Sequence, residues 1–254
     1  MKSSAMSLAE HLEALRWTLL KMLGLLVLGA SVSWCFYDPC FNLLMSPLKQ
    51  VARPIKLITV APLDAFTTKL TLSILLGLCA TLPGQLFLAW SFVSPGLKEA
   101  ERRVGLWVVT SGTFFFGLGM VFAYNLLGLL LNILVGFTPA GVEPIWQFNI
   151  YIDFAFRLLL AFGLLFELPV VVVLLVTLEL VQTRTLAKIR PHMILAIFIV
   201  AGVLTPPDVM SQILLGVPLV LLYELGLLVG RFQERRIELG RRSRKLQCQS
   251  AGNC

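Results

Sequence analysis

The residues with the clearest potential for chemistry are a few carboxylates in a chain that is otherwise apolar or basic. Glu167 is the one ionisable residue in the apolar stretch 158–178. A helix of about 20 residues spans about 30 Å, the thickness of the hydrocarbon core of a bilayer, so this carboxyl group is expected near the midplane. A charge there costs about 2.5–3.5 kcal/mol to insert. We expect either a protonated glutamate hydrogen-bonded inside a helix bundle or a polar spot on a path or docking surface in the membrane.

A second group of acidic residues lies in the polar segments that flank the apolar stretches, among many Lys and Arg residues. Its members are Glu10, Glu13, Glu99 and Glu101. Carboxylates bind guanidinium groups in bidentate geometry, so an acidic island on a basic face would attract a cationic peptide. The alternative is that Glu101 forms solvated loop pairs, each worth under about 1 kcal/mol, with Lys98, Arg102 or Arg103.

The other reactive side chains form no catalytic or metal-binding pattern. His11 and His192 have no Cys or His neighbour, and Ser211 has no His or Asp at a recognisable catalytic spacing. We therefore predict no enzyme activity, no metal and no cofactor. Asp208 follows two prolines and is expected to be the N-cap of the last helix.

The composition predicts a polytopic helical membrane protein. Hydrophobic residues make up 57% of the chain and charged residues 14%, whereas soluble domains are about 25% charged. A cytoplasmic amphipathic segment (1–16) is expected to precede a single transmembrane domain (17–230), and a basic tail (231–254) to follow it. The domain is predicted to contain six spans, at about 17–37, 70–90, 104–127, 157–178, 192–204 and 212–230. The rival interpretation of the first span is a cleaved signal peptide.

The segments between the spans complete the expected architecture. The mixed segment 38–68 is predicted to form short helices that cap one membrane face, and residues 136–156 are predicted to be a loop. Cys35 and Cys40 lie close together in sequence and could form a disulfide if that face is oxidising. The fifth span is short and requires a thinned bilayer or snorkelling flanks.

Charge sets the predicted orientation. Six spans place both termini on one side of the membrane, and about three quarters of the 21 Lys and Arg residues lie on that side. Because cytoplasmic loops carry the excess of basic residues, both termini are predicted to be cytoplasmic.

Several short motifs then occur in one order along the chain. They are His11-Leu12-Glu13-Ala14-Leu15-Arg16, Phe92, Pro95-Gly96-Leu97, Glu101-Arg102-Arg103, Phe166-Glu167-Leu168-Pro169-Val170, Leu204-Thr205-Pro206-Pro207-Asp208-Val209 and Ser211-Gln212. With six spans and this length, the sequence closely resembles the TatC family, whose members are subunits of the twin-arginine (Sec-independent) protein translocase. The resemblance covers about residues 8–232.

The resemblance implies an all-α, cup-like bundle of six helices in the bacterial cytoplasmic (inner) membrane. It implies a core receptor that binds signal peptides with paired arginines and helps export folded proteins using the proton-motive force. The implied partners are these peptides, single-span subunits of the TatA and TatB type, other copies of the chain and membrane lipid, with no nucleic acid. The alternative is a proton-coupled small-solute transporter with Glu167 as proton carrier, a class that often shows repeated halves; no convincing repeat is present.

By motif position, the resemblance also assigns two groups of site residues. The signal-peptide-binding group contains Glu13, Arg16, Phe92, Pro95, Glu99, Glu101 and Arg103. The intramembrane polar or partner-binding group contains Glu167, Thr205, Asp208 and Gln212. In this chain Ala14 stands where the family motif has Glu, and Glu13, about 100° away around a helix, or Glu10, one turn earlier, is the candidate replacement. Gln212 and Glu224 are polar in an apolar run and are expected to face protein, in this chain or in a partner helix.

Overall fold

The computed structural model describes residues 8–51, 53–94, 104–139, 141–204 and 208–250. Its elements, in chain order, are α1 (Leu8–Cys35), α2 (Tyr37–Lys49), β1 (Lys56–Ile58), α3 (Asp64–Val93), α5 (Gly105–Gly136), β2 (Ile145–Gln147), α6 (Phe148–Leu165), α7 (Leu168–Thr177), α8 (Thr183–Lys188), α9 (Arg190–Leu204) and α10 (Val209–Ser250). The chain divides into two compact units, Met1–Leu164 and Leu165–Cys254.

The apolar helices agree in number with the six predicted spans. Five helical stretches are long and apolar enough to cross a membrane: Ala9–Cys35, Asp64–Val93, Gly105–Gly136, Phe148–Thr177 and Val209–Leu239. The shorter apolar helix Arg190–Leu204 corresponds to the short fifth span. The fourth span consists of α6 and α7, and its helix is interrupted between them at Phe166 and Glu167.

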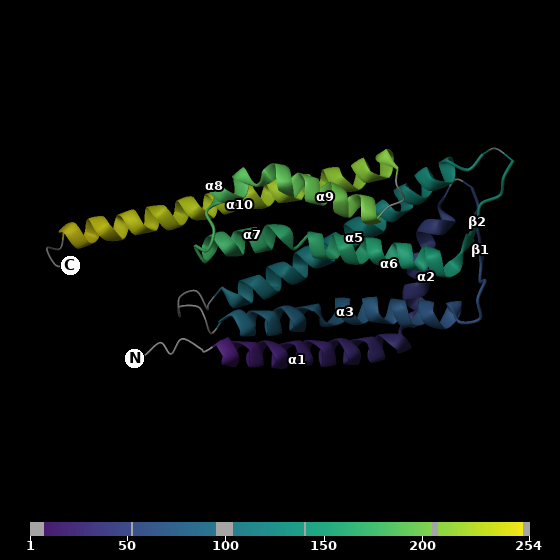
Figure 1. Ribbon diagram of the computed structural model, residues 1–254, viewed down its shortest axis with the longest axis horizontal. Coiled ribbons are helices and arrows are strands. Elements are labelled where there is room, and N and C mark those ends of the chain that lie inside the picture. Colours follow the sequence, from purple (N-terminus) through teal and green to yellow (C-terminus); the bar gives the residue numbers. More distant parts are fainter. Residues whose placement is uncertain (1–7, 52, 95–103, 140, 205–207, 251–254) are drawn as a thin grey trace. The chain divides into compact units, whose positions relative to one another are not determined.

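In the first unit, α1 and α3 lie side by side along most of their length (Figure 1). Small residues permit the approach. A Cβ on Gly77 would lie 2.3 Å from the backbone nitrogen of Ala30, and one on Gly29 would lie 2.8 Å from the carbonyl oxygen of Gly77. Gln85 adds a hydrogen bond by donating from Nε2 to the carbonyl oxygen of Met22 at 2.9 Å. In lipid, close packing of small residues and hydrogen bonds between helices replace the hydrophobic driving force, so these contacts hold the pair together.

A small cap covers the end of this unit where α3 begins. It contains α2 and a parallel sheet in which Lys56–Ile58 pairs with Ile145–Gln147. Asp64 is 6% exposed and accepts hydrogen bonds from the backbone N–H groups of Val60 (3.1 Å) and Ala61 (2.9 Å). Its carboxylate also accepts from Asn149 Nδ2 at 3.1 Å. One carboxylate thus fixes the entry to α3 and joins it to the start of α6.

The edge of the cap carries exposed polar contacts. Lys56 Nζ lies 2.6 Å from a carboxylate oxygen of Glu143, and this hydrogen bond and the lysine charge lower the pKa of Glu143. Arg53 donates to the carbonyl oxygen of Thr138 at 3.1 Å. Exposed pairs of this kind contribute little to stability, so the cap depends mainly on its less exposed contacts.

Two of the predictions for this region need correction. Short helices were expected in 38–68, and α2 confirms one of them, but the sheet was not anticipated because three-residue strands leave no alternating pattern. The loop predicted for 136–156 ends earlier, since α6 begins at Phe148. Asn149 lies in the first turn of this helix, and its side chain donates a hydrogen bond to Asp64.

Tyrosine hydroxyls attach α2 to the helices behind it. Tyr124 on α5 donates to the carbonyl oxygen of Leu43 at 3.0 Å, and the buried Tyr151 on α6 donates to that of Leu44 at 2.6 Å. Because Pro47 has no N–H, the carbonyl of Leu43 lacks its usual partner in the helix, and the bond from Tyr124 satisfies it. The cap is therefore fixed to the transmembrane helices by side chains from distant parts of the sequence.

In the second unit, α10 packs against α7 and α9. Glycines again set the spacing: a Cβ on Gly226 would lie 3.0 Å from Pro169 Cα, and one on Gly216 would lie 2.7 Å from the ring of Phe198. Helix α10 is 42 residues long and continues past the predicted span as far as Ser250. Much of the segment predicted as a basic tail is thus helical.

Candidate functional site

The first candidate site is the N-terminal part of α1 together with the end of α3. Helix α1 is continuous from Leu8, so the described part of the predicted amphipathic segment joins the first span without a break. The ring of His11 stacks on that of Phe92, with centroids 4.7 Å apart and an angle of 27° between the planes. This contact brings together two motifs that lie about 80 residues apart in sequence.

Glu13 and Arg16 lie exposed on the first turns of α1. Ala14 is half-buried, and its carbonyl oxygen accepts a hydrogen bond from Thr18 Oγ1 at 2.8 Å. Glu13 therefore points in a different direction from the side chain of Ala14, in agreement with the 100° rotation per residue. Pro95, Glu99, Glu101 and Arg103 lie outside the described residues, as does Thr205.

Glu167 occupies the break between α6 and α7. Its backbone carbonyl accepts a hydrogen bond from the N–H of Val171 at 2.9 Å, and Pro169 lies in the first turn of α7. The proline supplies no N–H and so suits this position. Glu167 Oε1 is buried and has no hydrogen-bond partner among the described residues.

The turn that starts α10 is organised by Asp208. Its Oδ2 accepts a hydrogen bond from the N–H of Ser211 at 2.7 Å, which confirms the predicted N-cap. Gln212 Nε2 donates to the carbonyl oxygen of Phe198 on α9 at 2.9 Å. Gln212 thus faces protein as predicted, and the contact lies within its own chain.

Glu224 also faces protein. It forms an ion pair of 2.9 Å with Arg190 at the start of α9, and both side chains are partly exposed. Its neighbour Tyr223 is buried and donates to the carbonyl oxygen of Leu186 on α8 at 2.9 Å. These bonds hold the segment between α7 and α9 against α10.

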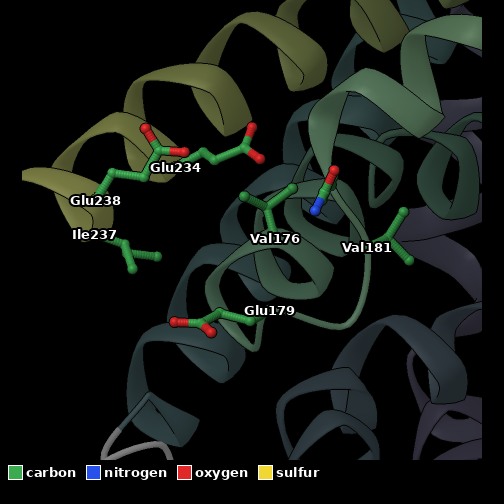
Figure 2. A pocket seen from close by; sticks show the side chains of 7 residues that line it. Val176, Glu179, Val181, Glu234, Ile237 and Glu238 are labelled. Carbon is green, nitrogen blue, oxygen red and sulfur yellow. The ribbon is translucent and has the colours of Figure 1, made fainter. Parts of the chain in front are cut away.

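An acidic pocket of about 170 Å³ lies in the second unit beside this segment. Figure 2 shows Glu234 and Glu238 projecting from α10 and Glu179 lying at the turn after α7. Glu234 is already engaged, because it accepts hydrogen bonds from the hydroxyl and the backbone N–H of Thr183. This pocket was not predicted, because its two acidic residues on α10 lie one helical turn apart among the arginines of the segment expected to be a basic tail. We assign it a structural role in holding α8 on α10.

Comparison with known proteins decides the family. The family described as "Sec-independent protein translocase protein (TatC)" matches residues 10–218. The chain belongs to the TatC family. It is 38% identical to the Sec-independent protein translocase protein TatC of Carboxydothermus hydrogenoformans, over 91% of this chain and 96% of that protein. It is 33% identical to TatC of Escherichia coli strain K12, over 89% of this chain and 88% of that protein.

A solved TatC structure has the same fold. The crystal structure of the twin arginine translocase receptor TatC in DDM aligns with a TM-score of 0.81 at 30% identity, covering 87% of this chain and 99% of that one. The predicted all-α, six-span TatC fold is confirmed. The TatC family also favours protein translocation over the alternative of a proton-coupled solute transporter.

Proposed function

We propose that this chain is the core receptor subunit of a twin-arginine translocase, with its peptide-binding face at the start of α1 and the end of α3. The chain is a member of a family of Sec-independent protein translocase subunits. The observation that carries the proposal is the stack of His11 on Phe92, since it joins the motif on α1 to the helix end that leads directly into residues 95–103. Glu99 and Glu101 belong to that segment.

The chemistry proposed for this face is recognition of two adjacent guanidinium groups. Glu13 is exposed on α1 two residues after His11, whose ring stacks on Phe92. A guanidinium can bind a carboxylate through two parallel hydrogen bonds, and its plane can stack on aromatic rings. Lysine offers neither the fork nor the plane. A face built from carboxylates and rings therefore favours paired arginines over paired lysines.

The remaining parts of the proposal follow from the family and from charge. Both termini are cytoplasmic, the membrane is the bacterial inner membrane, and the partners are TatA-type and TatB-type subunits, further copies of the chain and lipid. The cargo is a folded precursor moved by the proton-motive force, and the chain performs no catalysis. Glu167, Thr205, Asp208 and Gln212 provide polar positions in the membrane, of which Glu167 has a buried carboxyl oxygen that a partner could bind.

The test is photocrosslinking of a signal peptide with paired arginines to probes placed at Glu13, Phe92 and Glu101 of the intact, membrane-inserted protein. A probe at Phe36, exposed at the other end of the first helix, is the matched control. We expect crosslinks from the three sites with the arginine peptide and none with a paired-lysine peptide or from Phe36. Equal crosslinking of both peptides would contradict the receptor assignment.

A separate test addresses Glu167. Glu167→Gln keeps a hydrogen-bonding side chain without a titratable group, whereas Glu167→Ala removes the polar group. If Glu167 serves as a polar docking position, the glutamine variant retains export of a reporter with a twin-arginine signal and the alanine variant loses it. Loss of export in both variants at normal expression would instead point to a role for the ionisable proton.

A further inference from the structure

One side of α5 is exposed along most of the helix and carries two asparagines. Its exposed residues recur at spacings of three and four, so they form a single stripe. The α5 stripe consists of Phe114, Leu118, Val121, Asn125, Leu129 and Asn132. Phe114 and Val121 are 65% and 61% exposed, whereas Phe116 and Ala123, on the opposite side of the helix, are at most 2% exposed. The stripe is therefore the side of α5 that its own chain does not cover.

The two asparagines do not suit a surface that faces lipid. Asn125 lies inside the predicted span 104–127, and Asn132 follows two helical turns later, about 10 Å along the helix. Among the described residues, the Asn125 side chain forms one hydrogen bond, from Nδ2 to the carbonyl oxygen of Val121 in its own helix at 2.7 Å. Asn132 Nδ2 donates in the same way to the carbonyl oxygen of Gly128 at 2.9 Å.

A bond to the preceding turn uses only part of what the amide of Asn125 can form, because an amide has two donor hydrogens and an acceptor oxygen. Lipid tails supply no partner for the remaining groups, and an amide left in hydrocarbon without partners costs several kcal/mol. Polar side chains within spans usually face another helix for this reason. The polarity of the stripe thus favours a second helix over lipid as its neighbour.

The spacing along the stripe suits a nearly parallel helix pair. Two series of residues repeat every seven positions, as the a and d positions of a coiled coil do, and most helix pairs in membranes cross at the same shallow angle. The series are 118, 125 and 132, and 114, 121 and 128. Gly128 lies between the two asparagines, and a Cβ there would have Pro47 Cβ, at 3.9 Å, as its one described neighbour within 4 Å. A neighbouring helix can therefore approach closely beside both amides.

We propose that the α5 stripe is the contact between two copies of this chain, related by a two-fold axis along the membrane normal. All copies insert in one orientation, so this axis places α5 parallel to its copy and each residue at the depth of its counterpart. Residues 104–135 carry no charge, so two copies do not repel each other there. An amide both donates and accepts, so Asn125 and Asn132 can each bond to the same residue of the second copy. A different helix would need polar groups of its own at both depths.

The inference deepens the proposed function, on which it rests only for the expectation that further copies of the chain are partners. It identifies the surface at which two copies meet, and this surface lies on a different helix from Glu13 and Phe92 of the proposed peptide-binding face.

The first experiment measures self-association of the intact protein in lipid vesicles. Copies fused to a donor or an acceptor fluorescent protein are diluted with lipid, and energy transfer is recorded. We expect Asn125→Leu and Asn132→Leu each to weaken association and the double variant to weaken it about tenfold. Asn42→Leu, the same change at an exposed position of α2, is the matched control and should have no effect. Equal association of the double variant and the wild type would overturn the proposal, as would a wild type that does not associate.

The second experiment leaves both asparagines in place. Single cysteines are introduced into a chain without its five native cysteines and are oxidised in the membrane. A two-fold contact brings identical positions together, so we expect disulfide-linked dimers from Leu118→Cys and Val121→Cys. Leu164→Cys, at a similarly exposed position of α6, should give few. Equal yields at all three positions would indicate random collision and contradict the proposal, and so would crosslinks from α5 to a different protein only.

Peptide binding separates this proposal from the receptor function. The double asparagine variant should still crosslink a paired-arginine peptide, and not a paired-lysine peptide, through a probe at Glu13. If the wild type distinguishes the two peptides but its α5 cysteines do not link two copies, the interface is wrong and the receptor function stands. If the α5 cysteines link two copies but the peptides are not distinguished, the receptor function fails and the interface stands.

Discussion

The contact between α1 and α3 makes Gly77→Ala the most informative substitution in the first unit. A Cβ on Gly77 would lie 2.3 Å from the backbone nitrogen and 2.6 Å from the Cα of Ala30. Ordinary contact begins at 3.4 Å, so the two backbones must separate by about 1.1 Å. No side-chain rotation can relieve this clash, because the opposing atoms belong to the backbone of α1.

The cost follows from that separation. Overfilling a packed contact costs about 1–3 kcal/mol, and a backbone clash belongs at the upper end. A gap of about 0.5–1 Å also forfeits a quarter to a half of the dispersion energy of the facing atoms. Alanine returns about 1 kcal/mol through its higher helix propensity. We therefore expect Gly77→Ala to lower the free energy of unfolding by about 2 kcal/mol or more.

The assay is SDS titration of protein in mixed micelles, followed by circular dichroism. Gly24→Ala on α1 is the matched control, because a Cβ there meets no atom within 4 Å. The control should be neutral or gain up to about 1 kcal/mol. If Gly77→Ala unfolds at the same SDS fraction as Gly24→Ala, the two backbones do not approach as described and the reasoning is wrong.

Three further substitutions test other contacts by the same titration. Gln85→Leu removes the bond to Met22 and should cost about 0.5–1.5 kcal/mol; no loss would mean that the bond is not formed in the membrane. Asp64→Ala leaves the N–H groups of Val60 and Ala61 without their acceptor and should lower the free energy of unfolding by about 2–4 kcal/mol. Proteolysis of residues 50–63 should become faster, and Asp64→Asn should lose less stability than Asp64→Ala. Glu179 has a φ of 56°, a left-handed conformation that glycine adopts without strain. Glu179→Gly should therefore stabilise the turn after α7 by about 1 kcal/mol, and Glu179→Val should destabilise it. If the valine variant is the more stable of the two, the side chain matters more than the backbone.

Hydropathy predicted the spans because insertion depends on the summed apolar character of each segment, which is a local property of sequence. The cap could not be predicted in this way. Its strands are three residues long and derive their stability from Asp64 and from tyrosines on α5 and α6. Pro169 removes a backbone donor close to the interruption at Glu167, but whether a helix bends or breaks beside a proline depends on its neighbours.

The candidate site also contains features that sequence alone predicts and features that it does not. The capping role of Asp208 follows from two prolines and an acid, so sequence alone predicts it. The pairing of Glu224 with Arg190 joins residues 34 positions apart, and sequence indicated only that Glu224 must face protein. The close contact between Trp90 and the start of α5 could not be predicted, since it depends on Gly105 allowing α5 to approach. Glycine occurs near helix starts whether or not another helix packs there.

The receptor face depends on contacts that lie deep in the membrane. Glu13 is carried by α1 and Phe92 by α3, so the two parts of the proposed face are related through the packing of these helices. That packing is closest at Gly29 and Gly77, about 27 Å along α1 from His11. A slip of one helical turn would shift Glu13 by about 5.4 Å relative to Phe92 and would remove the bond from Gln85. Gly77→Ala should therefore weaken binding of the paired-arginine peptide, although no atom of Gly77 can touch the peptide. If Gly77→Ala loses stability but keeps full affinity for the peptide, the face is organised by its own contacts and not by the packing at Gly77.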